Sequence, residues 1–93
     1  MKRVMILLPT LNEEEGLSLV LPRVPYEKLE QSGWDAKVLV VDGGSDDLTS
    51  KIALEHKCQF IQQQGKGKGA AMRLGFLHFL KESFDALVML DPD

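Results

Sequence analysis

The stretch Ala-Lys-Val-Leu-Val-Val-Asp-Gly-Gly-Ser at residues 36–45 decides the fold. Its first six residues are rich in β-branched side chains, which favours a strand. The Asp-Gly-Gly-Ser that follows breaks the strand, because these residue types favour turns. A similar pattern, a short apolar run ending in polar or turn-forming residues, occurs at residues 2–8, 58–62 and 86–90. Four strands are therefore predicted, and 2–8 is apolar enough to be buried on both faces.

Helical patterns fill the three gaps between these strands. Asn12 resembles an N-cap, and Glu15 three residues later completes a capping-box pattern, which predicts a helix that Pro22 and Pro25 should end. A short helical piece is expected at 26–32, before Gly33.

Two further helices are expected later in the chain. One should begin after Asp46 or Asp47, either of which can cap it, and run to about residue 57. The other should follow the glycine-lysine loop 65–69 and run to about residue 83. An arc of this last helix is expected to pack in the core, namely Met72, Phe76, Phe79 and Leu80.

The order β-α-β-α-β-α-β predicts an α/β fold with three layers and a mainly parallel sheet, as in Rossmann-like folds. A length of 93 residues fits a single domain, residues 1–93. Ligands of such sheets bind at the carboxyl ends of the strands. The segments 9–13, 42–45, 65–69 and 91–93 should meet at that edge.

Composition narrows the function classes. The net charge of −3 argues against bulk binding of nucleic acid, which needs a basic face. Cys58 is the single cysteine, so an intramolecular disulfide is excluded and a reducing compartment is expected. The apolar opening is too short for a membrane span and lacks the pattern of a signal peptide. We therefore expect a cytoplasmic chain.

Asp91 and Asp93 flank a proline at the end of the fourth predicted strand. In an extended backbone, alternate side chains share a direction, so both carboxylates could approach one cation. Carboxylate oxygens suit Mg²⁺ or Mn²⁺, and Mg²⁺ commonly adds substrate phosphates to one or two carboxylates. The alternative is a solvated acidic turn.

The loop 65–69 combines three glycines with Lys66 and Lys68 and precedes a helix, and Arg73 lies one turn further on. Backbone amides, the helix N-terminus and the lysine charges can together hold an anion. The loop lacks the Ser or Thr of a Walker A loop. Gly65, Gly67 and Ala70 match the looser G-x-G-x-x-A pattern, so a dinucleotide-binding oxidoreductase module stays an alternative.

The four segments, taken in order, resemble the amino-terminal half of a family 2 glycosyltransferase. They read Val-Met-Ile-Leu-Leu-Pro-Thr-Leu-Asn-Glu-Glu, Val-Leu-Val-Val-Asp-Gly-Gly-Ser-Asp-Asp, Gly-Lys-Gly-Lys-Gly-Ala-Ala-Met-Arg-Leu-Gly-Phe and Val-Met-Leu-Asp-Pro-Asp. Dolichyl-phosphate and polyprenyl-phosphate sugar transferases are the members they resemble most. The resemblance implies the GT-A fold, a UDP- or GDP-sugar donor, and Mg²⁺ or Mn²⁺. It also implies an acceptor such as a lipid phosphate at the cytosolic face of a membrane.

The resemblance also implies roles for individual residues. Pro9, Leu11 and Glu13 would line the base and ribose pocket beside Thr10, and Asp42 would contact the base or ribose, with Val41 packing nearby. Near the diphosphate would lie Lys66, Lys68 and Arg73, and Asp91 and Asp93 would bind the metal. Gly43 departs from the family, since many members carry an aspartate there.

The resemblance covers a donor-binding half only. An acceptor-binding half would lie beyond residue 93, so the 93-residue chain by itself is expected to be inactive, and no catalytic residue is assigned within it. Besides the oxidoreductase module, a non-catalytic interaction domain with the same fold is an alternative. The sequence leaves the oligomeric state open.

Overall fold

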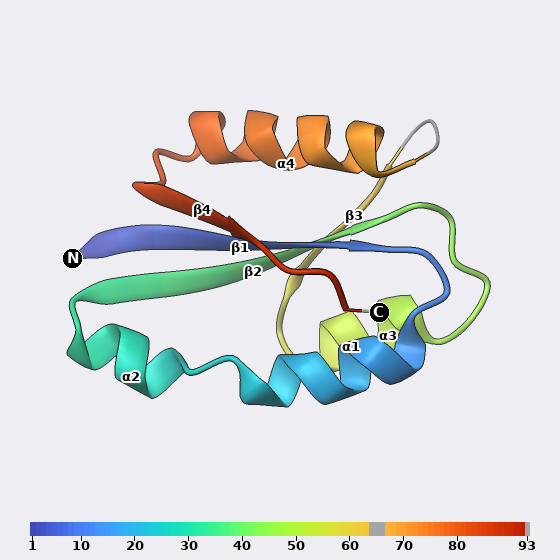
Figure 1. The fold of residues 1–93 in the computed structure, drawn as a ribbon, viewed down its shortest axis with the longest axis horizontal. Coiled ribbons are helices and arrows are strands. Elements are labelled where there is room, and N and C mark those ends of the chain that lie inside the picture. The colour runs from blue at the N-terminus through green and yellow to red at the C-terminus, as the bar shows by residue number, and fades with distance from the viewer. Residues whose placement is uncertain (64–66, 93) are drawn as a thin grey trace.

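A computed structural model describes residues 1–63 and 67–92 of the chain. Figure 1 shows three layers, with one parallel sheet between two layers of helices. The strands are β1 (Lys2–Thr10), β2 (Trp34–Asp42), β3 (Gln59–Gln62) and β4 (Ala86–Met89). The helices are α1 (Glu14–Val20), the 3-10 turn η1 (Leu21–Arg23), α2 (Tyr26–Gln31), α3 (Thr49–Glu55) and α4 (Lys68–Lys81). The predicted α/β class is confirmed.

The sheet has the order β3-β2-β1-β4, and every pairing in it is parallel. β1 and β2 pair along nine residues, from Lys2 opposite Trp34 to Thr10 opposite Asp42. After β3 the chain crosses to the other side of β1, where β4 pairs with it. Order reversals of this kind open a crevice at the carboxyl ends of the strands.

β1 is buried on both faces, as its continuous apolar run predicts. Ile6 and Leu8 face the layer formed by α1, α2 and α3, where they join Leu17, Val40 and Ala53. The alternate residues Met5 and Leu7 face α4 and pack with further core side chains, namely Leu39, Val41, Ala71 and Phe84. The two cores therefore share the central strands and hold the helices on opposite faces (Figure 1).

The predicted cap of the first helix is wrong. α1 begins at Glu14, and the side chain of the residue before it, Glu13, makes no capping hydrogen bond. Asn12 has a φ of 51°, the left-handed conformation that asparagine tolerates better than most residues. Its side-chain oxygen accepts a hydrogen bond from the backbone of Asp46 and so serves another loop.

Most of the other predicted boundaries agree with the structure. α1 gives way to the 3-10 turn that contains Pro22, and a short helix follows at α2, as expected. β2 is longer than predicted because it begins at Trp34 and includes Asp42. Asp47 accepts the Thr49 amide, although Leu48 is the residue directly before α3.

The predicted apolar arc of α4 is largely wrong. Met72, Phe76 and Leu80 are 46%, 53% and 65% exposed, and only Phe79 packs against the core. The side of α4 that faces the sheet carries small residues instead, Ala71 and Gly75. A Cβ placed on Gly75 would lie 2.4 Å from Leu7 Cδ2, so α4 sits too close to β1 for a larger residue there.

Within the described ranges, none of the helices is long and apolar enough to cross a membrane.

Replacing Gly75 with alanine tests this close approach. The new methyl would overlap Leu7, and overpacking of this kind costs roughly 1–3 kcal/mol in the free energy of unfolding. Gly69→Ala is the matched control, because a Cβ there meets nothing within 4 Å and alanine favours the helix. Urea unfolding followed by circular dichroism measures both variants. Equal stability of the two would contradict the packing described.

Candidate functional site

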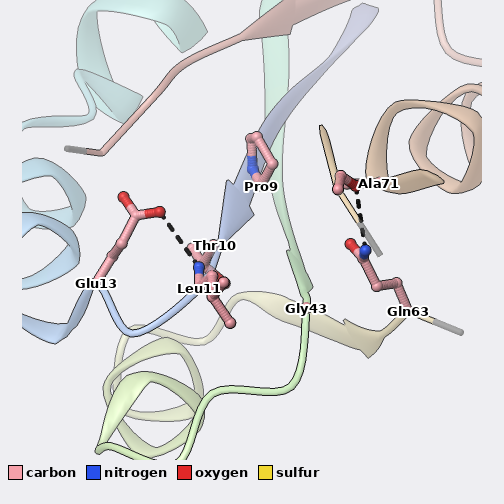
Figure 2. A pocket seen from close by; sticks show the side chains of 8 residues that line it. Pro9, Thr10, Leu11, Glu13, Gly43, Gln63 and Ala71 are labelled. Atoms are coloured by element: carbon pink, nitrogen blue, oxygen red, sulfur yellow. Dashed lines mark hydrogen bonds between the residues drawn. The ribbon is translucent and has the colours of Figure 1, made fainter. Parts of the chain in front are cut away.

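The carboxyl ends of the strands surround a cavity of about 440 Å³. Figure 2 shows it from close by, between the ends of β1 and β2 and the start of α4. Four of the residues that sequence reasoning singled out line it, namely Pro9, Thr10, Leu11 and Glu13. The structure therefore brings the end of β1, which extends to Thr10, and the loop after it to this edge, as the topology predicts.

Asp42 lies beside the cavity, and both oxygens of its carboxylate accept hydrogen bonds from other residues of the chain. Its Oδ1 accepts the hydroxyls of Thr10, at 2.8 Å, and Ser45, at 2.5 Å. Its Oδ2 accepts the backbone amides of Gly44, at 3.0 Å, and Ser45, at 2.7 Å. A carboxylate offers about four acceptor positions. These contacts fold residues 43–45 around the carboxylate and set the rim of the cavity, which Gly43 lines.

The same contacts determine the charge of Asp42, which is only 3% exposed. Burial alone raises the pKa of the carboxyl, but the hydrogen bonds from Ser45, Thr10 and Gly44 outweigh it and hold the pKa below its ordinary value of 3.8. Hydrogen bonds donated to a carboxylate favour its ionised form. The rim is therefore built on a negative charge at neutral pH.

Glu13 folds back over the loop after β1. Its Oε1 accepts the Leu11 amide at 3.2 Å, as the dashed line in Figure 2 shows, and its own amide donates to the Thr49 hydroxyl at 3.3 Å. Leu11 is 57% exposed at the cavity, where its side chain offers apolar surface. This segment thus combines one apolar surface with a nearby carboxylate.

Asp47 joins the starts of two helices. Its Oδ1 accepts the amide of Thr49, at 2.9 Å, and the hydroxyl of the same residue. Its Oδ2 accepts the Glu14 amide of α1 at 3.2 Å. The hydrogen bond from the Thr49 hydroxyl is the main reason that the pKa of Asp47 lies below its ordinary value. A negative charge at helix N-termini is favourable, so Asp47 stabilises both loops that border the site.

Two cavity residues were not identified from the sequence as contacts, Gln63 and Ala71. Gln63 directly follows β3, its amide donates to the Asp42 carbonyl at 2.7 Å, and its Nε2 donates to the Gly67 carbonyl at 3.2 Å. Its position at the carboxyl end of a strand is the signal that could have identified it. Gly67, with a φ of 89°, lies directly before α4 and brings the helix N-terminus to the cavity.

The predicted cations are only partly located. Lys66 lies outside the described residues, as does Gly65 of the G-x-G-x-x-A pattern, and Lys68 is the first residue of α4. Arg73 does not line the cavity. It lines a separate apolar groove of about 710 Å³ between α4 and β4. A role for Arg73 near a diphosphate therefore stays a prediction.

Val41 is fully buried in the core beneath the site and shows no surface to the cavity. Asp91 follows β4 at the predicted edge and is exposed, whereas Asp93 lies outside the described residues. Among residues 1–63 and 67–92, no three His, Cys, Asp or Glu side chains gather closely enough to hold a metal ion. The metal pair thus stays a prediction.

Comparison with known proteins gives a consistent result. Residues 5–93 match the family Glycosyl transferase family 2. The chain is 36% identical over 90 residues to the glycosyltransferase AglJ of Haloferax volcanii, covering 97% of this chain and 27% of the relative. It is 32% identical over 99 residues to the polyprenol monophosphomannose synthase of Mycolicibacterium smegmatis, covering 99% of this chain and 36% of the relative.

A solved structure agrees with these matches. Glucosyl-3-phosphoglycerate synthase from Mycobacterium tuberculosis, in complex with Mn²⁺, UDP and glucosyl-3-phosphoglycerate, superposes with a TM-score of 0.75 at 25% identity. The superposition covers 99% of this chain and 34% of that protein. The chain thus spans about a third of the length of these relatives. Because the family match covers nearly every residue and the fold agrees, the chain belongs to glycosyl transferase family 2.

Proposed function

We propose that residues 1–93 are the donor-binding half of a glycosyltransferase, which holds the nucleoside diphosphate of a UDP- or GDP-sugar. The cavity at the carboxyl ends of the parallel strands carries this proposal, because it joins an apolar surface, a buried carboxylate and a helix N-terminus. Its volume is within the usual range of small-molecule pockets. An acceptor-binding half would come from other residues of a longer protein.

The base, the ribose and the diphosphate of a nucleoside diphosphate would each contact a different part of the cavity. Pro9 and Leu11 offer apolar surface to a base, and Thr10 and Glu13 lie beside them for the ribose. The N-terminus of α4 would face the diphosphate, since amides at a helix N-terminus favour anions. Lys66, Lys68 and Arg73 are the candidate cations. Asp42 shapes the rim, and any contact with base or ribose would share its oxygens with the loop.

Asp91 and Asp93 are the proposed metal ligands. An exposed carboxylate at a strand end suits Mg²⁺ or Mn²⁺, which also bind substrate phosphates. When bound, such an ion neutralises the charge on the departing nucleoside diphosphate. The Mn²⁺ and UDP in glucosyl-3-phosphoglycerate synthase support this assignment.

The acceptor is proposed to be a lipid phosphate at the cytosolic face of a membrane. The similarity to a polyprenol monophosphomannose synthase supports this class of acceptor. We propose that the 93-residue chain alone transfers no sugar, because the acceptor-binding half is needed. Sugar transfer by the purified 93-residue chain would contradict this proposal.

Calorimetry tests donor binding. We expect the chain to bind UDP or GDP weakly, and more tightly when Mn²⁺ is present than without it. Asp91→Ala should abolish the gain from Mn²⁺, because it removes one of the proposed ligands. Asp35→Ala is the matched control, since it removes the same charge at the amino end of β2, at the opposite edge of the sheet. No binding of either nucleotide with or without Mn²⁺ would exclude the proposed site, and the non-catalytic interaction domain would then be favoured.

Unfolding at low pH tests whether the negative charge of Asp42 stabilises the fold. Because the folded pKa of Asp42 is below 3.8, its hydrogen bonds stabilise the fold fully above that value. The contribution is lost as the pH falls through the folded pKa. Asp42→Asn should lower the free energy of unfolding by about 2 kcal/mol at pH 6 and by less at pH 3. Urea unfolding at both pH values measures this, with Asp35→Asn as the control. An equal loss at both pH values would contradict it.

A further inference from the structure

The loops after β1 and β2 are joined through Asn12. Its backbone amide donates to the Ser45 hydroxyl oxygen at 2.8 Å, and its side-chain Oδ1 accepts the Asp46 amide at 2.9 Å. One residue of the first loop therefore holds two consecutive residues of the second. These contacts bridge positions more than thirty residues apart in the sequence.

The Ser45 hydroxyl carries this contact on to Asp42. It accepts from Asn12 and donates to Asp42 Oδ1 at 2.5 Å, so it connects the two residues directly. The Asp42 carboxylate in turn folds the segment that includes Gly43, on the rim of the cavity. Asn12 thus stands at the outer end of a chain of hydrogen bonds that leads to the rim.

Asn12 itself is exposed and does not line the cavity. It borders a shallow hollow formed by the start of α1, Asp47 and Pro92. Its left-handed backbone, at φ 51°, turns the amide and the side chain toward the second loop. Few residues other than glycine, asparagine and aspartate adopt this conformation without strain.

We propose that Asn12 is a positioning residue that holds residues 43–46 in the shape needed to bind the nucleotide donor, without touching the donor. This inference rests on the proposed function. Its new content is that donor affinity depends on a side chain outside the cavity, through its hydrogen bond to the Asp46 amide. The Asn12 backbone amide holds the neighbouring Ser45, which contacts Asp42.

Two substitutions distinguish the effect of the Asn12 side chain from that of its left-handed backbone. Asn12→Gly keeps the left-handed conformation but removes the acceptor of the Asp46 amide, whereas Asn12→Asp keeps an acceptor oxygen. Ser83→Gly is the matched control, because Ser83 is also exposed with a positive φ, 57°, at the opposite edge of the sheet. All three variants retain the core, so they should fold.

Hydrogen exchange followed by NMR measures how well the amides of residues 43–46 are protected when no ligand is present. In Asn12→Gly the Asp46 amide should exchange roughly three- to tenfold faster, the change expected for one lost hydrogen bond. Amides in the middle of β1 and β2 should be unchanged, and Asn12→Asp should restore most of the protection. Uniformly faster exchange would indicate a general loss of stability and would overturn the proposal.

Calorimetry with UDP and Mn²⁺, or with GDP if that is the nucleotide bound, measures the Kd of the donor nucleotide in each variant. Asn12→Gly should raise the Kd by a similar factor, Asn12→Asp should raise it less because it keeps the acceptor oxygen, and Ser83→Gly should bind like the unaltered chain. Unchanged exchange of Asp46, or unchanged affinity in Asn12→Gly, would overturn the role of Asn12. If the unaltered chain binds neither nucleotide, the proposed function fails and this inference, which rests on it, fails with it. The exchange data still show whether Asn12 holds the loop.

Discussion

Thr10 and Asp42 are the last pair of the nine-residue parallel ladder between β1 and β2, and the candidate site depends on their contact. The ladder aligns the two strands so that both end at the same level. The Thr10 hydroxyl then meets the Asp42 carboxylate, and the Gly43 amide donates to the Thr10 carbonyl at 2.8 Å. A shift of the register by one residue would turn Asp42 to the other face of the sheet, and its hydrogen bonds to Thr10 and to residues 44–45 would be lost.

The contacts of Asp42 show how one carboxylate can shape the rim of a candidate site through hydrogen bonds to its own loop. Preorganised dipoles bind charged ligands well because they need no reorganisation when the ligand arrives. Asp42 organises the amides and hydroxyl of the 43–45 loop, and Asp47 does the same for the starts of α1 and α3. The two carboxylates therefore hold the loops after β1 and β2, and these loops carry Leu11, Glu13 and Gly43, which line the cavity.

The sequence predicted the sheet well, and it predicted that the segments after the first two strands meet at the carboxyl edge, because apolar runs and the direction of parallel connections are local or topological properties. It could not predict the conformation of Asn12, since a capping box depends only on residues 12–15, whereas the actual partners of Asn12 are Ser45 and Asp46. The α4 error has a similar cause. Helical periodicity identifies an apolar arc, but the close approach at Gly75 decides which arc meets the sheet. The positions of Lys66 and Asp93 lie outside the described residues.

The outward arc of α4 has a consequence for how the molecule behaves in water. Met72, Phe76, Leu77 and Leu80 are exposed beside Met89 of β4, which is the outermost strand on its side of the described sheet. An apolar surface next to an open strand edge favours association between copies as concentration rises. These 93 residues are therefore expected to associate with one another as their concentration rises, even when each copy stays folded.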